Sequence, residues 1–429
     1  MRIALLLTGD ELMSGDTVDS NSAYIAQSLK DLGMTPRIKK VVGDDLELLT
    51  DSITELSSAS DVLIVNGGLG PTVDDLTALA LSKATGSNLT RNEAAMAHLS
   101  AWAEPRGFVV TESNLKQADL PEICEIVDNP VGSAVGFRCV WQNCMIICTP
   151  GVPNEFKKMV EGQVLPLIKS HAGIKETIKI TRLRLFGITE SGLQDIVNEK
   201  FPDWPKEIEL GFRVQMPVIE VKLTSRGGQF DYLNDHWTEK FSNLFSDYVI
   251  GANGTRLTQA LNKALAKSNK KIVTAESCTG GSIASGIVSE AGSSHVFDGA
   301  FVVYSNAMKQ SVLDVPSSII DEYGAVSEQV VLAMAKGALE KSDADMAISI
   351  SGIAGPEGGT PEKPVGTVWM AWGEKDSLKA RRFFLPMPRL AFQRTAASIA
   401  MDLVRRELLK LSTDIDYFSE LKRKPKHIS

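Results

Sequence analysis

The chain has 429 residues, of which 43% are apolar and 23% charged, and its formal net charge is −8 at pH 7. This length predicts roughly two to three domains, and the balance of apolar and charged residues is typical of globular proteins. The acidic charge balance argues against a general nucleic-acid-binding surface, which is usually basic. We therefore expect small-molecule partners and no nucleic acid.

Membrane and secretory signals are weak in this sequence. No apolar run approaches the ~18 residues that suggest a membrane span. A short apolar run begins the chain, but Asp10 and Glu11 stand where a signal peptide would have small residues. The five cysteines include no CxxC pair, so neither a disulfide framework nor a zinc site is indicated. We expect a cytoplasmic protein with no membrane partner.

Buried strands alternate with helices in the first third of the chain. The pattern predicts strands at 2–7, 38–42 and 61–65 and helices at 21–32 and 46–56. This alternation predicts an α/β domain with a doubly wound, mostly parallel sheet. In such sheets a ligand lies beyond the carboxyl ends of the strands, where glycines and acidic residues gather in this sequence.

The most informative stretch of this part is the loop 66–77, with the sequence NGGLGPTVDDLT. Gly67, Gly68 and Gly70 let the backbone approach a ligand closely, as a phosphate requires. Asp74 and Asp75 add hard oxygen ligands that suit Mg²⁺ or a similar cation. The alternative is a glycine turn followed by acidic residues at a helix start, which the helix dipole favours without any metal.

This loop resembles the GGLGPTxDDLT signature of the competence/damage-inducible CinA family, whose first domain is similar to molybdopterin-binding domains. Segments 9–11, 42–45, 129–136 and 150–155 also match, although Val135 stands where the family often has proline. The resemblance implies a nucleotide-like ligand and a divalent cation at Asp74 and Asp75. The nucleotide-site residues that it implies are Gly9, Glu11, Asn21, Gly67, Gly68, Gly70, Pro71 and Thr72. In some family members this domain is a metal-dependent ADP-ribose pyrophosphatase, and in others it has no assigned activity.

From residue 175 the pattern changes to an alternation of apolar and polar residues. Half-buried strands are predicted at 177–186 and 218–223, with a helix at 189–201 between them. This pattern predicts a small α+β domain that acts as a spacer or forms a dimer. The predicted division of the chain is 1–170, 171–253, 254–412 and a flexible tail at 413–429.

The C-terminal part is again predicted as α/β, and its key feature is the turn TAESCTGG at 274–281. A strand before this turn and a helix at 282–288 place Ser277 where helical N–H groups point out unpaired. That position suits an anion or a serine oxygen that attacks a carbonyl. The alternative is that Ser277 is an ordinary helix N-cap.

A serine nucleophile needs a base, and this part of the chain has few candidates. His295 lies in a predicted loop without a neighbouring motif, so it is the weaker candidate. Lys309 follows a strand predicted at 299–304 and has Tyr304 and Asn306 beside it. Burial or positive potential must lower the pKa of a lysine before it can act as a base. The alternative is a solvated turn lysine.

Segments 275–281, 303–309, 324–327 and 351–368 closely resemble the C-terminal domain of the CinA family, over about residues 255–410. The resemblance implies a nicotinamide mononucleotide deamidase of the Ser/Lys type, without a cofactor. It assigns Ser277 as nucleophile, Lys309 as base and Tyr304 as a proton-relay or orienting group. The substrate-binding residues that we expect are Thr279, Gly280, Gly281, Asn306, Ser351, Gly352, Gly355, Gly358, Gly359, Thr360, Arg389 and Arg394. Gln393 stands where the family usually has one of two paired arginines.

The expected reaction converts nicotinamide mononucleotide and water into nicotinic acid mononucleotide and ammonia, in pyridine nucleotide recycling. A second expected activity is the hydrolysis of ADP-ribose by the N-terminal domain. The alternative is a regulatory protein that binds nucleotides without turnover. We also expect a homodimer or a higher homo-oligomer.

Overall fold

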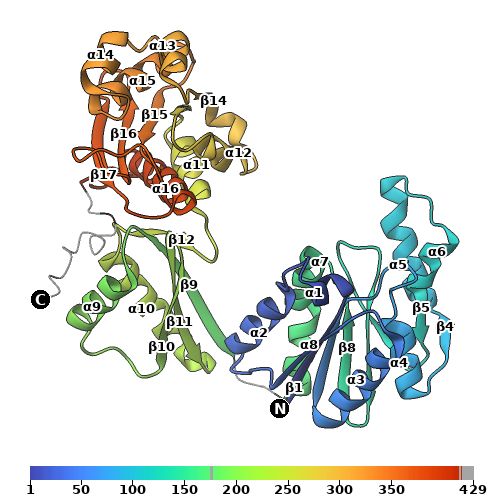
Figure 1. Ribbon diagram of the computed structural model, residues 1–429. Coiled ribbons are helices and arrows are strands. Elements are labelled where there is room, and N and C mark those ends of the chain that lie inside the picture. The colour runs from blue at the N-terminus through green and yellow to red at the C-terminus, as the bar shows by residue number, and fades with distance from the viewer. Residues whose placement is uncertain (174–176, 415–416, 418–429) are drawn as a thin grey trace, which may run out of the picture. The chain divides into compact units, whose positions relative to one another are not determined.

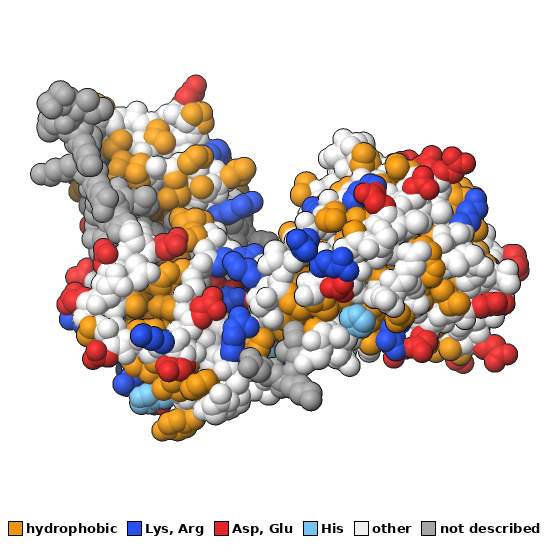
Figure 2. Space-filling model, turned by 90° about the horizontal axis from the view of Figure 1, so that it is seen from below, with side chains coloured by type: hydrophobic (Ala, Val, Ile, Leu, Met, Phe, Trp, Pro, Cys, Tyr) orange, Lys and Arg blue, Asp and Glu red, His pale blue; other side chains and the backbone are white. Residues whose placement is uncertain are grey.

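The computed structural model of the chain describes residues 1–173, 177–414 and 417 (Figure 1). They belong to two compact units, Met1–Glu176 and Thr177–Ser429. None of the helices in these ranges combines the length and apolar character that crossing a bilayer requires. Acidic, basic and apolar side chains are mixed on the face shown in Figure 2.

The first unit is built on a six-stranded sheet with the order β2-β1-β3-β8-β7-β6. Its first four strands are parallel, β7 runs antiparallel to them, and β6 pairs antiparallel with β7. The strands are β1 (Ile3–Thr8), β2 (Ile38–Val42), β3 (Val62–Asn66), β6 (Glu125–Val127), β7 (Gly136–Trp141) and β8 (Cys144–Thr149). The expected mostly parallel, doubly wound sheet is confirmed.

Helices cover both faces of this sheet, and all six residues of β1 are therefore buried. Ile3, Leu5 and Leu7 pack with α2 (Asn21–Asp31), α7 (Pro153–Met159) and α8 (Leu165–His171). Ala4 and Leu6 pack on the opposite side with α3 (Leu46–Ala59) and α4 (Thr77–Thr85). The remaining elements are α1 (Asp10–Ser14), β4 (Leu89–Arg91), α5 (Glu93–Ala103), α6 (Glu112–Leu115) and β5 (Asp119–Pro121), and a π-helix, Val160–Val164, joins α7 to α8.

The second unit begins with an antiparallel sheet of four strands in the order β10-β11-β9-β12. The strands are β9 (Ile178–Phe186), β10 (Ile208–Gln215), β11 (Val218–Arg226) and β12 (Val249–Ala252). Helices α9 (Glu190–Lys200) and α10 (Asp231–Leu244) share its hydrophobic core. The α+β class is confirmed, while β10, α10 and β12 were not predicted.

The last part of the chain forms a five-stranded sheet with the order β14-β13-β15-β16-β17. The strands are β13 (Ile272–Glu276), β14 (Phe297–Val302), β15 (Met346–Gly352), β16 (Thr367–Glu374) and β17 (Lys379–Phe384). The first three in the sheet order are parallel. One core contains α11 (Leu257–Lys267), α12 (Ser282–Val288) and α16 (Arg389–Leu408), and the other contains α13 (Asn306–Leu313), α14 (Ser317–Tyr323) and α15 (Glu328–Glu340). This arrangement confirms the α/β class.

The predicted tail at 413–429 lies mostly outside the described residues. Within it, the Tyr417 side chain is buried. Its ring centroid lies 5.5 Å from that of Phe186 and 5.9 Å from that of Phe383. The Tyr417 hydroxyl donates a hydrogen bond of 2.6 Å to Oδ2 of Asp402 on α16. Tyr417 therefore belongs to the core that α11, α12 and α16 share.

Candidate functional site

Ser277 lies in the turn between β13 and α12, at the carboxyl end of a buried parallel strand. Its backbone N–H donates to the carbonyl of Ile350 on the neighbouring β15. Gly280 and Gly281 have φ angles of 61° and 95°, a region that side chains disfavour. These two glycines let the chain turn sharply into α12, and the Ser277 side chain is left only 7% exposed.

Glu276 occupies the N-terminus of α12 and changes the interpretation of Ser277. Its fully buried carboxylate accepts hydrogen bonds from the backbone N–H groups of Gly281, Ile283 and Ala284, at 2.9–3.1 Å. It also accepts from the hydroxyl of Thr279 at 2.7 Å. The N-cap residue of α12 is Gly281, so the alternative that Ser277 is an ordinary cap is wrong.

The expectation of unpaired helical N–H groups beside Ser277 is also wrong, because the Glu276 carboxylate accepts from them. A carboxylate is favoured where a helix begins. Glu276 was missed in the sequence. The available signal was an acidic residue at the end of an apolar strand, because a buried charge needs hydrogen-bond donors within the protein.

Lys309 lies on α13, and its ammonium group reaches the Ser277 turn. Strand β14 ends at Val302, and Ser305 caps α13 by accepting from the N–H of Met308 at 3.1 Å. Lys309 Nζ lies 3.1 Å from Ser277 Oγ. Strands β13 and β14 are parallel neighbours, so the segments that follow them meet at one sheet edge. The alternative of a solvated turn lysine is wrong, because Lys309 is only 1% exposed.

Burial makes the neutral form of Lys309 easier to reach than that of a solvated lysine. Burial lowers the pKa of Lys309, against a smaller opposing effect of Cys278. Nζ also lies 3.0 Å from each of the carbonyl oxygens of Val303 and Tyr304. In the neutral form, two N–H bonds can serve these carbonyls while the lone pair faces Ser277.

Cys278 is the other nucleophilic side chain of the turn. Burial raises the pKa of Cys278 to about 12, so its thiol stays protonated at neutral pH. Because the thiolate is the reactive form of cysteine, Cys278 is a poor nucleophile here. Ser277, with a buried amine beside it, is the stronger candidate.

Arg389 links three predicted parts of the site. Its Nη1 donates to the carbonyl of Gly355 at 2.9 Å, and its Nη2 donates to the hydroxyl of Tyr304 at 3.4 Å. Tyr304 is 63% exposed, and its hydroxyl contacts Arg389. Gln393 donates to the carbonyl of Cys278 at 2.8 Å. In the described ranges, the Arg394 side chain makes no hydrogen bond or ion pair with any of these groups.

The other predicted binding residues divide into those that hold loops and those that remain accessible. The hydroxyl of Ser351 donates to the carbonyl of Ala325 at 2.8 Å, and that of Thr360 accepts from the N–H of Lys363 at 3.1 Å. These two hydroxyls are therefore used within the protein. Asn306 is exposed at the start of α13. Gly352 ends β15, and Gly355, Gly358 and Gly359 belong to the loop that follows.

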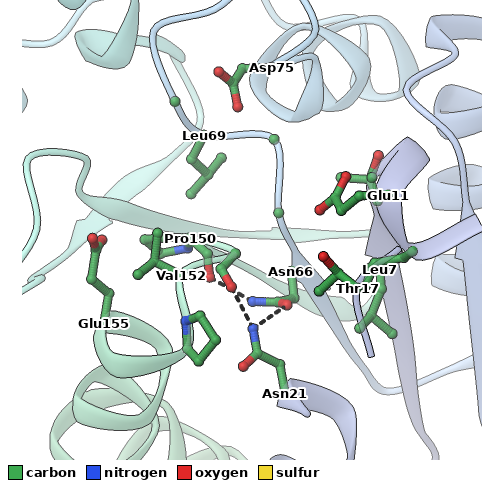
Figure 3. Close-up of a pocket in the computed structure, with 18 of the residues that line it drawn as sticks. Leu7, Glu11, Thr17, Asn21, Asn66, Leu69, Asp75, Pro150, Val152 and Glu155 are labelled. Atoms are coloured by element: carbon green, nitrogen blue, oxygen red, sulfur yellow. Dashed lines mark hydrogen bonds between the residues drawn. The ribbon is translucent and has the colours of Figure 1, made fainter. Parts of the chain in front are cut away.

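The first unit contains a second candidate site, a cavity of about 530 Å³ beyond the carboxyl ends of β1, β3 and β8. Asn21 Nδ2 donates to Asn66 Oδ1 at 3.0 Å and to the carbonyl of Gly151 at 2.7 Å (Figure 3). These bonds fix the cavity wall across three segments of the chain. The predicted residues that line the cavity are Gly9, Glu11, Asn21, Gly67, Gly68, Gly70, Pro71, Asp74 and Asp75, but not Thr72.

The charge of this cavity is one-sided. Its described lining contains no lysine, arginine or histidine. It contains six carboxylates: Glu11, Asp19, Asp44, Asp74, Asp75 and Glu155. Glu11, Asp75 and Glu155 come from three different segments around the cavity (Figure 3). An anionic ligand would have to meet backbone N–H groups or a cation here.

The predicted metal ligands Asp74 and Asp75 could hold a cation only if a substrate phosphate and water complete its coordination. No group of three or more His, Cys, Asp or Glu side chains in the described ranges could hold a metal ion. Asp75 Oδ2 already accepts from the backbone N–H of Thr72 at 2.8 Å. Mg²⁺ commonly binds through one or two carboxylates together with substrate phosphates and water, and Asp74 with Asp75 fits that arrangement.

Comparison with known proteins identifies relatives along nearly the whole chain. Residues 4–170 match the family model of a probable molybdopterin binding domain, and residues 254–408 match that of the CinA C-terminal domain. A CinA-like protein of Colwellia psychrerythraea is 48% identical over 422 residues, which cover 98% of each chain. A CinA-like protein of Shewanella woodyi is 42% identical over 98% of this chain and 99% of its own. The crystal structure of the competence/damage inducible protein CihA from Agrobacterium tumefaciens matches 36% of this chain and 93% of its own, with 35% identity and a TM-score of 0.35.

Proposed function

Since this chain belongs to the CinA-like protein family, we propose that its C-terminal part is a Ser/Lys amidohydrolase acting on nicotinamide mononucleotide. The observation that carries the reaction class is the 3.1 Å contact between Ser277 Oγ and the buried Lys309 Nζ. A serine beside an amine of lowered pKa is an activated nucleophile. The choice of nicotinamide mononucleotide rests on the resemblance of the motifs to the family.

The first half of the reaction forms an ester on Ser277. Neutral Lys309 takes the hydroxyl proton as Ser277 Oγ attacks the carboxamide carbon, and the carbonyl oxygen becomes an oxyanion. When this intermediate collapses, the C–N bond breaks and Lys309 returns the proton to the leaving nitrogen. Ammonia is released, and the nicotinoyl group remains on Ser277.

The second half restores the enzyme with the same base. Lys309 takes a proton from water, whose oxygen attacks the ester carbon. The bond to Ser277 Oγ breaks, the serine recovers its proton, and nicotinic acid mononucleotide leaves. One lysine thus acts as base and then as acid in each half, which requires a pKa below that of a free lysine.

Stabilisation of the oxyanion is assigned to the backbone of the serine turn. The N–H groups of Gly281, Ile283 and Ala284 are occupied by Glu276, and that of Gly280 donates to the carbonyl of Ser277. Within the described chain, the N–H groups of Cys278 and Thr279 donate to no other residue. Each such donor contributes roughly 3 kcal/mol to transition-state stabilisation.

Ammonia release from nicotinamide mononucleotide tests this proposal directly. The wild-type protein should release ammonia and form nicotinic acid mononucleotide, and Ser277→Ala should abolish both while the circular dichroism spectrum stays unchanged. Ser285→Ala, an exposed serine on α12, is the matched control and should keep full activity. Absence of turnover in the wild type, or normal turnover in Ser277→Ala, would contradict the proposal.

For the N-terminal domain we propose metal-dependent hydrolysis of ADP-ribose to AMP and ribose 5-phosphate. The supporting observation is a cavity of about 530 Å³ that joins a glycine loop to six carboxylates, with no basic side chain among its described lining residues. A divalent cation would neutralise the diphosphate and polarise it for attack by water. Asp74 and Asp75 would share in holding that cation, while the backbone at Gly67 and Gly68 lets the diphosphate come close.

Formation of AMP from ADP-ribose, with and without EDTA, tests this second activity. AMP should appear only when a divalent cation is present, and Asp74→Asn and Asp75→Asn should each reduce its formation. The exposed Asp51 on α3 supplies the control Asp51→Asn. Hydrolysis that resists EDTA would refute the metal dependence, and tight nucleotide binding without turnover at either site would favour a regulatory protein.

A further inference from the structure

Strand β10 forms an open edge of the antiparallel sheet in the second unit (Figure 1). In the described part of the chain β10 pairs only with β11, and its other side has no strand partner. It is eight residues long and contains neither proline nor lysine. Exposed edges are normally kept short or interrupted by such residues, because an open edge is a template for another strand.

Backbone groups of alternate residues on β10 point away from β11. The N–H of Ile208 donates to the carbonyl of Pro205, and the carbonyl of Ile208 accepts from the Trp204 indole at 2.7 Å. Ile208 therefore does not exchange hydrogen bonds with Ser225, its neighbour in the β11 register. Residues two apart on a strand turn the same way, so Leu210, Phe212 and Val214 also direct their backbone groups outward.

The side chains of β10 are arranged symmetrically about Gly211. On one face, Ile208 and Leu210 precede it, and Phe212 and Val214 follow it. On the other face, Glu209 precedes Gly211 and Arg213 follows it. The sequence of β10 thus reads apolar, acidic, apolar, glycine, apolar, basic, apolar.

Neither charge is well paired within its own chain. Glu209 lies 3.9 Å from Arg226. Arg213 stands opposite Glu220 in the β11 register but forms no ion pair within 4.0 Å among the described residues. Both side chains are exposed. Val214 is 43% exposed and Met216, in the adjoining turn, is 60% exposed, so the apolar face is also incompletely covered at this end.

We propose that β10 pairs antiparallel with β10 of a second copy of this chain, about a twofold axis at Gly211. The pairing joins two four-stranded sheets into one sheet of eight strands. Glu209 of each copy then faces Arg213 of the other, which gives two equivalent ion pairs. Leu210 faces Phe212, also twice, and such cross-strand pairs stabilise antiparallel sheets. Ile208 takes no part in the pairing, because Pro205 and Trp204 already use its outward backbone groups.

This register is favoured over its neighbours. A twofold axis perpendicular to the sheet keeps each face of the sheet on its own side, so it must coincide with a residue. Moving the axis to Leu210 places Glu209 opposite Gly211, and moving it to Phe212 places Arg213 opposite Gly211. Both shifts lose the paired charges of Glu209 and Arg213.

Gly211 itself supports the axis. A Cβ atom placed on Gly211 would meet nothing within 4 Å, and the residue does not have a positive φ angle. Its own chain therefore gives no packing or backbone reason for glycine, which weakens a strand. At the axis the two backbones come within about 4.5 Å of each other at Cα, a close approach at which glycine is characteristic.

Charge reversal followed by charge exchange tests the pairing, with the mass in solution measured by light scattering and sedimentation equilibrium on the full chain. The wild type should be dimeric at micromolar concentration. Arg213→Glu should raise the dimer dissociation constant by roughly tenfold or more, since Glu209 would then face a glutamate twice. The double variant Glu209→Arg/Arg213→Glu should restore the dimer, because it re-forms both ion pairs with opposite polarity.

Lys263→Glu makes the same change in net charge on the exposed side of α11 and should leave the mass unchanged. A monomeric wild type would overturn the pairing. So would a dimer that Arg213→Glu leaves intact, or a folded double variant that stays monomeric. None of these outcomes depends on amidohydrolase activity, so the proposed function is tested separately.

Discussion

The two candidate sites of this protein occupy the same topological position and differ in where their charge lies. Each lies beyond the carboxyl ends of parallel strands. In the C-terminal site, the ionisable groups Glu276 and Lys309 are buried and already have partners inside the protein. In the N-terminal site, six carboxylates line an open cavity of about 530 Å³ whose described lining holds no basic side chain, and one of them, Asp19, pairs with Lys39 outside that lining.

The difference separates a site that brings its own proton acceptor from one that depends on what enters it. A buried lysine with a serine beside it needs only substrate and water. An acidic cavity repels a phosphate group until a cation neutralises it. The same sheet edge can therefore support two unrelated chemistries, and changes at single residues should affect one site without the other.

Replacing Lys309 should have the largest effect on amidohydrolase activity. A small effect would contradict the contrast between the two sites. Lys309→Met removes the buried amine beside Ser277 while keeping an unbranched side chain, so ammonia release should fall by roughly 10³-fold. Hydrolysis of ADP-ribose by the same protein should be unchanged. The exposed Lys336 on α15 gives the control Lys336→Met, and equal losses in both variants would contradict a specific role.

The pH dependence of the amidohydrolase reports the same residue. Only the neutral amine can take the serine proton, so kcat/KM should rise with pH and level off above the pKa of Lys309. Since burial lowers that pKa, the midpoint should lie below 10.5, the ordinary lysine value. A rate that continues to rise beyond pH 10.5 would show that the reacting lysine is solvated.

Glu276→Gln should reduce both stability and turnover. The amide replaces one carboxylate oxygen with a donor that faces backbone N–H groups, so at least one buried N–H loses its acceptor. We expect the free energy of unfolding to fall by roughly 1–3 kcal/mol in urea denaturation. Glu328→Gln, at the exposed first turn of α15, should cost only a few tenths of a kcal/mol. Similar losses in the two variants would show that burial of Glu276 carries no special weight.

Arg389→Ala should raise KM for nicotinamide mononucleotide more than it lowers kcat. The change releases the carbonyl of Gly355 and the hydroxyl of Tyr304 and removes a candidate for the phosphate contact, so kcat/KM should fall by roughly 30-fold. Arg394→Ala is the matched control and should change little. A larger effect at Arg394 would reassign the phosphate contact to it.

The smallest effect is expected for Tyr304→Phe. The hydroxyl is exposed and contacts Arg389 rather than Lys309, so its loss should change kcat by less than about fivefold. A loss of 100-fold or more would instead support the proton-relay role that the family resemblance implies. The measurement therefore distinguishes orientation from proton transfer.

Periodicity predicted most of the α/β framework, because buried strands and amphipathic helices have distinct spacings. Strand β2 and helix α12 were predicted with the bounds that the structure has. Strand β10 was missed although its apolar residues alternate with Glu209, Gly211 and Arg213, and only Gly211 weakens that pattern. Those same residues have an evident role only when a second strand is considered.

The candidate site was predictable in its residues but not in its contacts. Ser277 and Lys309 were singled out by type and motif, while their separation depends on the order of β13 and β14 in the sheet. Glu276 escaped because sequence spacing does not show that a side chain folds back onto the helix that follows it. The choice between Arg389 and Arg394 likewise depends on which side of α16 faces the glycine loop.

Tyr417 shows that a homologous region and a folding unit need not end at the same residue. The match to the CinA C-terminal domain ends at residue 408, whereas the aromatic contacts of the core extend to Tyr417. A protein that ends at residue 408 would lose Tyr417, expose the faces of Phe186 and Phe383 that it covers, and leave Asp402 without its phenolic donor. Excision of this domain for biophysical work should therefore keep the chain through Tyr417, and a fusion partner is better attached beyond that residue.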